Sequence, residues 1–256
     1  MPDAPPTVAV VLAAGKGTRI ACDVPKALLP LCGQPLVSHV IEAARGAGVD
    51  RVLVVVGHAA EQVTQAVGPD CLCALQREQK GSAHALLSCA EALAGYRGTV
   101  LVLYCDVPLL GADLLRDLLR LHRETGAAAT LLSVVLDDPA AYGRILRGPG
   151  GEVLGIVEAK DATPVQRAIR EINVGVYCFE APLVFEILKE VRPNNVKGEL
   201  YLTDAIGLLA QRGHRVAALT AGDTEAIAGV NTLEELAAVE RAMLRRRERE
   251  AHPCKR

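Results

Sequence analysis

Short aliphatic runs alternate with amphipathic segments along the first half of the chain, and this alternation constrains the fold most. Three such runs, residues 8–12, 51–56 and 100–103, consist mostly of Val and Leu. Continuous aliphatic runs of this length are typical of strands buried on both faces, as in parallel sheets. Segments with helical spacing are found at residues 36–47, 59–67, 82–93 and 112–124, and shorter extended ones at 71–75 and 128–136. The order predicts an α/β fold with a mostly parallel, doubly wound central sheet and flanking helices.

The second half of the chain has a different pattern. A turn cluster, Gly148-Pro149-Gly150-Gly151, separates two short extended segments and predicts a β-hairpin over residues 144–158. A further strand is expected at residues 173–179, and helices at 182–189, 202–212 and 233–249. Because no internal repeat or low-complexity linker interrupts the chain, we expect one domain over residues 1–231 and a helical tail over 232–256.

Composition excludes several classes of protein. The net charge is −2 and aromatic residues make up only 3% of the chain, so neither a broad basic field nor base-stacking platforms indicate nucleic-acid binding. The first apolar run, residues 8–14, is far too short to span a bilayer, so no membrane insertion is expected. We therefore expect a cytoplasmic protein.

Cysteine usage points to a reducing environment. No CxxC pair is present among the eight cysteines, and most lie in apolar segments. We therefore expect buried, reduced thiols rather than a zinc site or a disulfide framework. The residues are Cys22, Cys32, Cys71, Cys73, Cys89, Cys105, Cys178 and Cys254.

The loop after the first predicted strand has the chemistry of a phosphate site. In α/β sheets, ligands bind outside the carboxyl ends of the strands, where the segment Leu12-Ala-Ala-Gly-Lys-Gly-Thr-Arg19 lies. Its glycines allow backbone N–H groups to approach phosphate, while Arg19 and Lys26 add positive charge. Pro25 and Pro30 stiffen the chain around Lys26. The loop matches neither the P-loop nor the dinucleotide-binding pattern.

Other polar residues are ambiguous when taken singly. Asp106, at the end of a predicted strand, is either a ligand or a helix cap, and Asn231 is either a ligand or the cap of the last helix. Glu158 is either a site residue or half of a surface ion pair, Asn173 either a site or a turn residue, and Tyr104 either a site or a core phenol.

The order of these segments resembles one family. Residues 12–19 followed by Pro25-Lys26 resemble the signature of sugar-nucleotide pyrophosphorylases, and further blocks narrow the resemblance to GlmU-type N-acetylglucosamine-1-phosphate uridyltransferases. The blocks cover nearly the whole chain in family order: Leu75–Ala85, Tyr104–Leu109, Tyr142–Ile145, Ile156–Thr163, Glu171–Gly175, Gly198–Asp204 and Gly229–Asn231.

The resemblance implies a Rossmann-like nucleotidyltransferase fold with a small sugar-binding β subregion. It also implies Mg²⁺-dependent transfer of UMP from UTP to N-acetylglucosamine 1-phosphate, giving UDP-N-acetylglucosamine and pyrophosphate. By the same resemblance, Arg19 and Lys26 are catalytic, and Asp106 and Asn231 bind the metal. The implied nucleotide-binding residues are Leu12, Ala13, Ala14, Gly15, Gln76, Gly81 and Ser82, and the implied sugar-binding residues are Tyr104, Cys105, Gly143, Glu158 and Asn173.

The chain departs from the family at several points. Cys105 stands where Gly is usual, so its side chain narrows the site or changes the sugar preference, and Ser82 stands where Thr is usual. Bifunctional members continue into a left-handed β-helix that transfers an acetyl group, but this sequence contains no hexapeptide repeats. Acetyl transfer is therefore not expected, and without that trimerising element the oligomeric state is not predicted.

Two other functions stay open from the residues. One is uridylyl or thymidylyl transfer to another sugar 1-phosphate such as glucose 1-phosphate, because one fold serves many substrates. The other is a non-catalytic UDP-sugar sensor, although Arg19, Lys26, Asp106 and Asn231 are all present. The attacking phosphate is already an anion, so the proposed transfer needs positioning and charge neutralisation rather than a general base.

Overall fold

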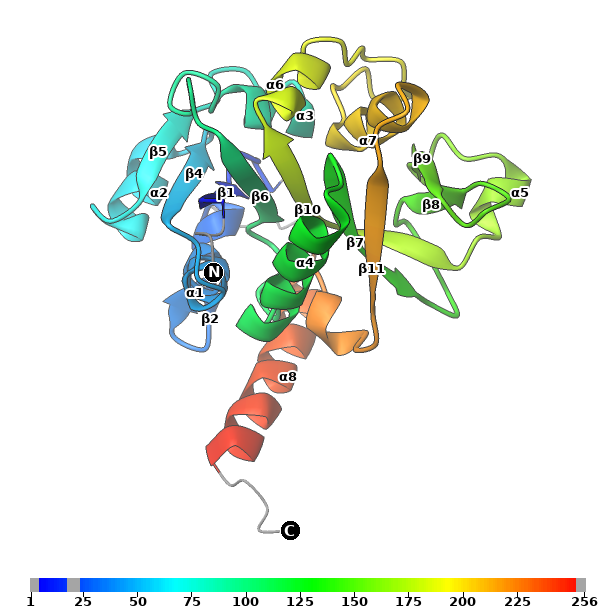
Figure 1. Cartoon of the computed structure of the whole chain (residues 1–256). Helices are drawn as coiled ribbons and strands as arrows, with labels where there is room; N and C mark the ends of the chain where they lie inside the picture. The colour runs from blue at the N-terminus through cyan, green and yellow to red at the C-terminus, as the bar shows by residue number, and fades with distance from the viewer. Residues whose placement is uncertain (1–4, 18–23, 252–256) are drawn as a thin grey trace.

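The computed structural model describes residues 5–17 and 24–251, and its centre is a nine-stranded sheet (Figure 1). The main path across the sheet runs through β11 (Val216–Ala221), β7 (Ala129–Val135), β10 (Glu171–Ala181), β6 (Gly98–Tyr104), β1 (Thr7–Leu12), β4 (Arg51–Val56) and β5 (Leu72–Leu75). The hairpin of β8 (Arg144–Arg147) and β9 (Val153–Val157) joins the sheet through β10. The predicted hairpin is therefore confirmed, although its second strand ends one residue before Glu158.

The sheet is mostly parallel, as predicted. Strands β6, β1, β4 and β5 run parallel, and so do β7 and β11. Among the described strands of this sheet, only β10 and the strands of the β8–β9 hairpin pair antiparallel. All six residues of β1 are buried, because helices cover both faces of the sheet.

Two helical layers form the two halves of the core. Alternate residues of β1 face opposite sides, so Val8 and Val10 belong to one cluster and Ala9 and Val11 to the other. The first cluster includes residues of α3 (Ser82–Leu87), α6 (Leu183–Leu188) and α7 (Leu202–Gln211). The second includes residues of α1 (Leu36–Gly46), α2 (Ala60–Val67) and α4 (Ala112–Thr125), and Figure 1 shows these layers on either side of the sheet.

The last helix, α8 (Leu233–Ala251), packs against the body with its first half and then extends away from it (Figure 1). Val239, Ala242 and Met243 form a third cluster with Leu29 and Leu36. A short helix, η1 (Lys26–Leu28), precedes Leu29, and a hairpin of two short strands, β2 (Pro30–Leu31) and β3 (Gln34–Pro35), lies between Leu29 and Leu36. Another short helix, η2 (Glu225–Ile227), precedes α8. A domain boundary at residue 231 stays a prediction.

One predicted helix needs correction, and two elements were missed. The helix expected over residues 82–93 ends at Leu87, because Cys89 and Ala90 bond to carbonyls three residues back and tighten the chain into turns. Strand β11 and the four-residue helix α5 (Pro164–Arg167) were not predicted. The β11 sequence Val-Ala-Ala-Leu-Thr-Ala has neither a continuous large aliphatic run nor strict alternation, so its pattern is weak.

Within the described residues, no helix is both long and apolar enough to cross a membrane. The cysteines described there are free, as predicted. Most are buried, but Cys73 is exposed on the edge strand β5, which contradicts its predicted burial. Cys22 and Cys254 lie outside the described residues.

Candidate functional site

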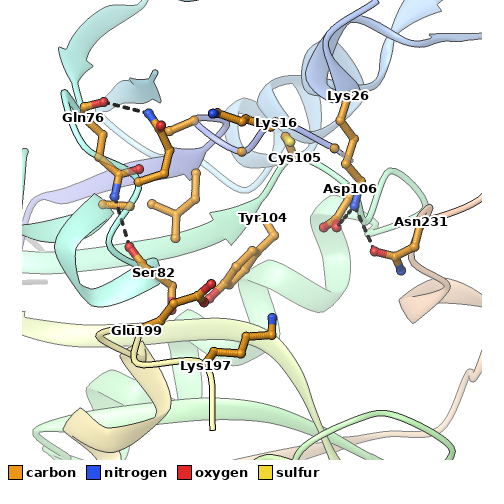
Figure 2. A pocket seen from close by; sticks show the side chains of 17 residues that line it. Lys16, Lys26, Gln76, Ser82, Tyr104, Cys105, Asp106, Lys197, Glu199 and Asn231 are labelled. Carbon is orange, nitrogen blue, oxygen red and sulfur yellow. Dashed lines mark hydrogen bonds and ion pairs between the residues drawn. The ribbon is translucent and has the colours of Figure 1, made fainter. Parts of the chain in front are cut away.

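A cavity of about 510 Å³ lies at the carboxyl ends of β1 and β6 (Figure 2). The two strands are adjacent and in register, with Leu12 opposite Tyr104, so the glycine loop after β1 and the polar segment after β6 meet at one edge of the sheet. The predicted site residues that line the cavity are Leu12, Ala14, Gly15, Lys26, Gln76, Gly81, Ser82, Tyr104, Cys105, Asp106 and Asn231.

Four of the described site residues do not line this cavity, and Arg19 lies outside the described residues. Ala13 faces the opposite side of the sheet, because side chains alternate at the end of β1, and its N–H donates to Val55 O at 2.9 Å. Gly143, Glu158 and Asn173 lie in a neighbouring group beyond Tyr104.

The glycine loop is folded closely around Lys26. Gly17 has a φ of +62°, and a Cβ added there would lie 2.7 Å from Cβ of Lys26. No side chain fits in that space, so glycine is required for the approach. Gly15 has no atom within 4 Å of such a Cβ, so its backbone borders open space in the cavity.

Lys26, Asp106 and Asn231 converge at one point of the cavity wall (Figure 2). The ammonium group of Lys26 donates to a carboxylate oxygen of Asp106 at 2.5 Å and to the amide oxygen of Asn231 at 3.0 Å. The three residues come from η1, from the turn after β6 and from the segment before α8. A backbone bond from Val230 N to Asp106 O, 2.8 Å long, holds the last two segments together.

Neither capping alternative fits Asp106 and Asn231. Thr232 caps α8, because its hydroxyl accepts from Glu235 N at 3.1 Å while the Glu235 carboxylate accepts from Thr232 N at 3.1 Å. The nearest helix after Asp106 is α4, whose N-cap is Gly111. Both side chains instead direct an oxygen at the same ammonium group.

This oxygen pair is suited to a hard cation. Carboxylate and amide oxygens are ligands that Mg²⁺ accepts, and Mg²⁺ keeps most of its shell for water or phosphate oxygens. Among residues 5–17 and 24–251, no cluster of three or more His, Cys, Asp or Glu side chains is arranged to hold a metal. The oxygen pair of Asp106 and Asn231 fits the sparse protein ligation of Mg²⁺, whereas a structural zinc site needs a closed set of four ligands.

Gln76 and Gly81 form the opposite wall of the cavity. The Gln76 amide is buried, and its nitrogen bonds Gly81 O at 3.1 Å and Nδ1 of His84 at 3.1 Å. Gly81 has a φ of +111°, and an added Cβ would lie 2.4 Å from Leu200 O. The amide orientation and the backbone path are therefore both fixed before any ligand binds.

Ser82 links this wall to Tyr104. The Ser82 hydroxyl accepts a hydrogen bond from Leu202 N at 2.9 Å, and its polar group acts to lower the pKa of the Tyr104 phenol. Burial is the main cause that raises the pKa of Tyr104 far above its ordinary value, and the nearby carboxylates of Glu158 and Asp106 add to it. The phenol is therefore a neutral hydrogen-bonding group at physiological pH.

Behind Tyr104, Gly143, Glu158 and Asn173 lie together. Asn173 N donates to Gly143 O at 2.8 Å, and a Cβ added to Gly143 would lie 3.5 Å from the Glu158 carboxylate. Burial raises the pKa of Glu158, and the Thr203 hydroxyl donates to its carboxylate at 3.3 Å. Thr203, rather than a surface lysine, is thus the partner of Glu158.

Asn173 is part of a strand rather than a turn. It lies in β10, beside an irregularity in the pairing with β7. Its amide nitrogen donates to the hydroxyl of Tyr177 at 2.7 Å, and its amide oxygen accepts from Gly175 N at 3.2 Å. These two bonds fix the side-chain amide of Asn173.

Sequence reasoning assigned no role to several residues that line the cavity. They are Lys16, Gln79, Ala85, Lys197 and Glu199. Lys16 belongs to the glycine loop, whose composition was a sufficient signal. Lys197 and Glu199 lie in an irregular segment before α7 and have no periodic pattern that could have indicated their position.

Comparison with known proteins identifies the family. The model of the MobA-like NTP transferase domain matches residues 9–163, which is more than half of the chain. The chain belongs to this family. That span contains the glycine loop, Lys26, Gln76 and Asp106, so most of the cavity wall comes from the shared domain.

Relatives named "Bifunctional protein GlmU" extend the similarity beyond residue 163. Those of Pelotomaculum thermopropionicum and Brevibacillus brevis are each 47% identical over 93% of this chain, and that of Pelobacter propionicus is 46% identical over 93%. The chain spans about half the length of these relatives, 52% in each case. The predicted resemblance to GlmU-type proteins is confirmed.

The fold is shared with a solved structure as well. A crystal structure of UDP-glucose pyrophosphorylase complexed with UDP-glucose superposes with a TM-score of 0.72 and covers 94% of this chain and 99% of its own. The two sequences are 21% identical, so this likeness concerns the fold alone. It confirms the predicted nucleotidyltransferase architecture.

Proposed function

We propose that this chain transfers UMP from UTP to N-acetylglucosamine 1-phosphate. A phosphate oxygen of the sugar phosphate attacks the α-phosphorus of UTP, the bond from that phosphorus to the oxygen bridging to the β-phosphate breaks, and pyrophosphate leaves. The observation that carries the proposal is the convergence of Lys26, Asp106 and Asn231 beside the glycine loop. Such a transfer requires positioned positive charge more than proton chemistry.

In this proposal, the uridine of UTP binds at the wall formed by Gln76 and Gly81. The backbone of residues 12–15 and the side chain of Ser82 complete it, and Gln76 is a fixed amide that can pair with the uracil edge. Lys26 serves as one phosphate cation. Arg19, outside the described residues, is proposed as the second because an arginine fork can grip two phosphate oxygens.

Asp106 and Asn231 would hold Mg²⁺ in this proposal. Bound there, Mg²⁺ would neutralise charge on the phosphates of both substrates. The protein itself contributes two oxygens that already point to one position, and the Lys26 ammonium that now contacts them is long and mobile enough to turn to a phosphate.

The sugar of the second substrate is proposed to bind at Tyr104 and at the residues behind it, Gly143, Glu158 and Asn173. Tyr104 is a neutral hydrogen-bonding group, Glu158 can accept from sugar hydroxyls, and Asn173 presents a fixed amide. Gly143 leaves room beside Glu158. Cys105 lines the cavity between Tyr104 and Asp106, so its side chain is proposed to shape the sugar preference.

One other substrate has specific support. The solved enzyme that shares this fold is bound to UDP-glucose, which keeps glucose 1-phosphate as a second candidate. A silent sensor is disfavoured, because the cation and both oxygen ligands are assembled at the cavity. We place the reaction in the cytoplasm because it consumes a nucleoside triphosphate.

A substrate panel tests the proposal. Pyrophosphate release would be measured with UTP and Mg²⁺ and with N-acetylglucosamine 1-phosphate, glucose 1-phosphate or glucosamine 1-phosphate, and then with dTTP in place of UTP. The proposal predicts the highest kcat/KM for UTP with the N-acetyl sugar. A preference for glucose 1-phosphate would replace the proposed substrate, and no release with any pair from folded protein that binds UDP-N-acetylglucosamine would indicate the sensor.

A further inference from the structure

The segment before α7 is joined to the nucleotide wall by backbone hydrogen bonds. Leu200 N donates to Lys80 O at 2.7 Å, and Ala83 N donates to Leu200 O at 2.9 Å. The Ser82 hydroxyl, which accepts from Leu202 N, continues the same row of bonds. The position of this segment relative to the cavity is therefore set by the main chain rather than by loose surface contacts.

A turn organised by Asn195 then directs the segment over the cavity. The amide nitrogen of Asn195 donates to Glu199 O at 2.6 Å, and its amide oxygen accepts from the N–H groups of Lys197 and Glu199, both at 3.2 Å. The intervening Gly198 has a φ of +63°, which favours glycine. Lys197 thus starts from a fixed backbone, and only its side chain is free to move.

The Lys197 side chain lines the cavity on the side of Tyr104 (Figure 2). Figure 2 places it across from Lys26, Asp106 and Asn231 and away from Gln76. Among the described residues, no carboxylate lies within the 4.0 Å of an ion pair with it. Its charge still acts on Glu158, whose pKa it lowers against the larger effect of burial.

These contacts point to a role for Lys197 in binding at the end of the cavity near Tyr104, where the sugar substrate is proposed to lie. An ammonium group that lines a cavity without an ion-pair partner is available to a ligand, and its three N–H donors fit anionic oxygens. The wall with Gln76 lies at the other end of the cavity, and Lys26, Asp106 and Asn231 lie opposite Lys197. The uridine part of the nucleotide is uncharged and its proposed site lies at the other end, so the anionic group expected on this side of the cavity is the phosphate of the sugar substrate.

We propose that Lys197 binds the phosphate of the sugar 1-phosphate substrate and thereby sets the affinity for that substrate. This inference rests on the proposed function. Because Lys197 lies across the cavity from Lys26, Asp106 and Asn231, we expect its binding contribution to be equal before and at the transition state, so its loss changes KM more than kcat.

Steady-state kinetics of Lys197→Ala, Lys197→Arg and Lys197→Glu test this proposal, with UTP and N-acetylglucosamine 1-phosphate varied independently. We expect Lys197→Ala to raise the KM for the sugar phosphate by about tenfold, as for one charge-assisted hydrogen bond, while the KM for UTP changes less than about twofold. Lys197→Arg should stay near wild type and Lys197→Glu should be worse than Lys197→Ala. Added salt should narrow the gap between the alanine variant and the wild type.

Lys189→Ala is the matched control, because Lys189 is an exposed lysine at the end of α6 that does not line the cavity. It should leave both KM values unchanged. Any of three results would overturn the inference alone. They are an unchanged sugar-phosphate KM in Lys197→Ala, an equal rise in the KM for UTP in that variant, and a KM in Lys197→Arg as high as in Lys197→Ala. Wild-type protein that transfers UMP to no sugar phosphate would overturn the proposed function, and this inference with it.

Discussion

The ammonium nitrogen of Lys26 lies 2.5 Å from a carboxylate oxygen of Asp106, although 80 residues separate them along the chain. The contact exists because β1 and β6 are neighbours in a parallel sheet, which brings the segments that follow them to the same edge. Asn231 joins the pair from a third segment, held by the backbone bond between Val230 and Asp106.

Gly17→Ala should reduce activity by more than its loss of stability can explain. The new Cβ would lie 2.7 Å from Cβ of Lys26, so the loop or Lys26 must shift away from Asp106. A shift of about 1 Å in a positioned group costs about 100-fold in rate, which we expect to see in kcat. Gly33→Ala is the control, since Gly33 also has positive φ, +84°, but has no atom within 4 Å of an added Cβ. Equal activity of the two variants would contradict the prediction.

Glu158→Gln should change the pH dependence of stability in a defined direction. Burial raises the pKa of Glu158 in the folded state, so the folded protein binds this proton more tightly than the unfolded chain does. Below the pKa of the unfolded chain, the carboxyl is protonated in both states, and its ionisation costs no folding free energy. Once the pH exceeds the folded-state pKa, the carboxyl is ionised in both states, and the full cost of burying its charge destabilises the folded protein. The free energy of unfolding of Glu158→Gln should therefore exceed that of the wild type at pH 7, and the gain should shrink toward pH 4.

Urea unfolding at several pH values measures this difference. The same variant should lose at least about tenfold in kcat/KM for the sugar phosphate, because a carboxylate is a stronger acceptor than an amide. A stability gain that grows toward pH 4 would show that the carboxylate is favoured by its surroundings in the folded state, contrary to the burial of Glu158.

Cys105 should resist alkylation although it lines the cavity. Burial, with the negative charge of Asp106 adding to it, raises the pKa of its thiol to about 12, so at pH 8 only about one molecule in ten thousand is the reactive thiolate. Cys73 is exposed on β5. Peptide mapping after iodoacetamide treatment at pH 8 should find Cys73 modified at least about 100 times faster than Cys105. Similar rates at the two cysteines would contradict the described burial of Cys105.

The parts of the fold that depend on local pattern were predictable. Aliphatic runs gave β1, β4 and β6 within one or two residues, and the rule that ligands bind at strand ends placed the glycine loop and Asp106 at one edge. Side chains alternate between the two faces of a strand with a period of two, and this rule would have shown that Ala13 points away from Leu12 and Ala14.

Other parts depend on contacts between distant segments. Strand β11 has small and half-buried residues, so its place beside β7 is decided by pairing rather than by its own pattern. Lys197 reaches the cavity because Leu200 bonds to residues near Gly81, more than a hundred positions earlier. No local periodicity encodes such a contact. Helix α3 stops early because bonds to carbonyls three residues back replace the α-helical ones after Leu87.

The most direct test of the central claim is the rate at which Asp106→Asn forms UDP-N-acetylglucosamine from UTP, Mg²⁺ and N-acetylglucosamine 1-phosphate. The substitution keeps the shape of the side chain but removes the charge that faces Lys26. Asp113→Asn is the control, because Asp113 is an exposed residue of α4 paired with Arg116. We predict a fall in kcat of about 100- to 1000-fold for Asp106→Asn with an unchanged unfolding midpoint, and a rate within about twofold of wild type for Asp113→Asn. Product formation by Asp106→Asn at the rate of Asp113→Asn would contradict the assignment of the Lys26, Asp106 and Asn231 group as the reacting centre.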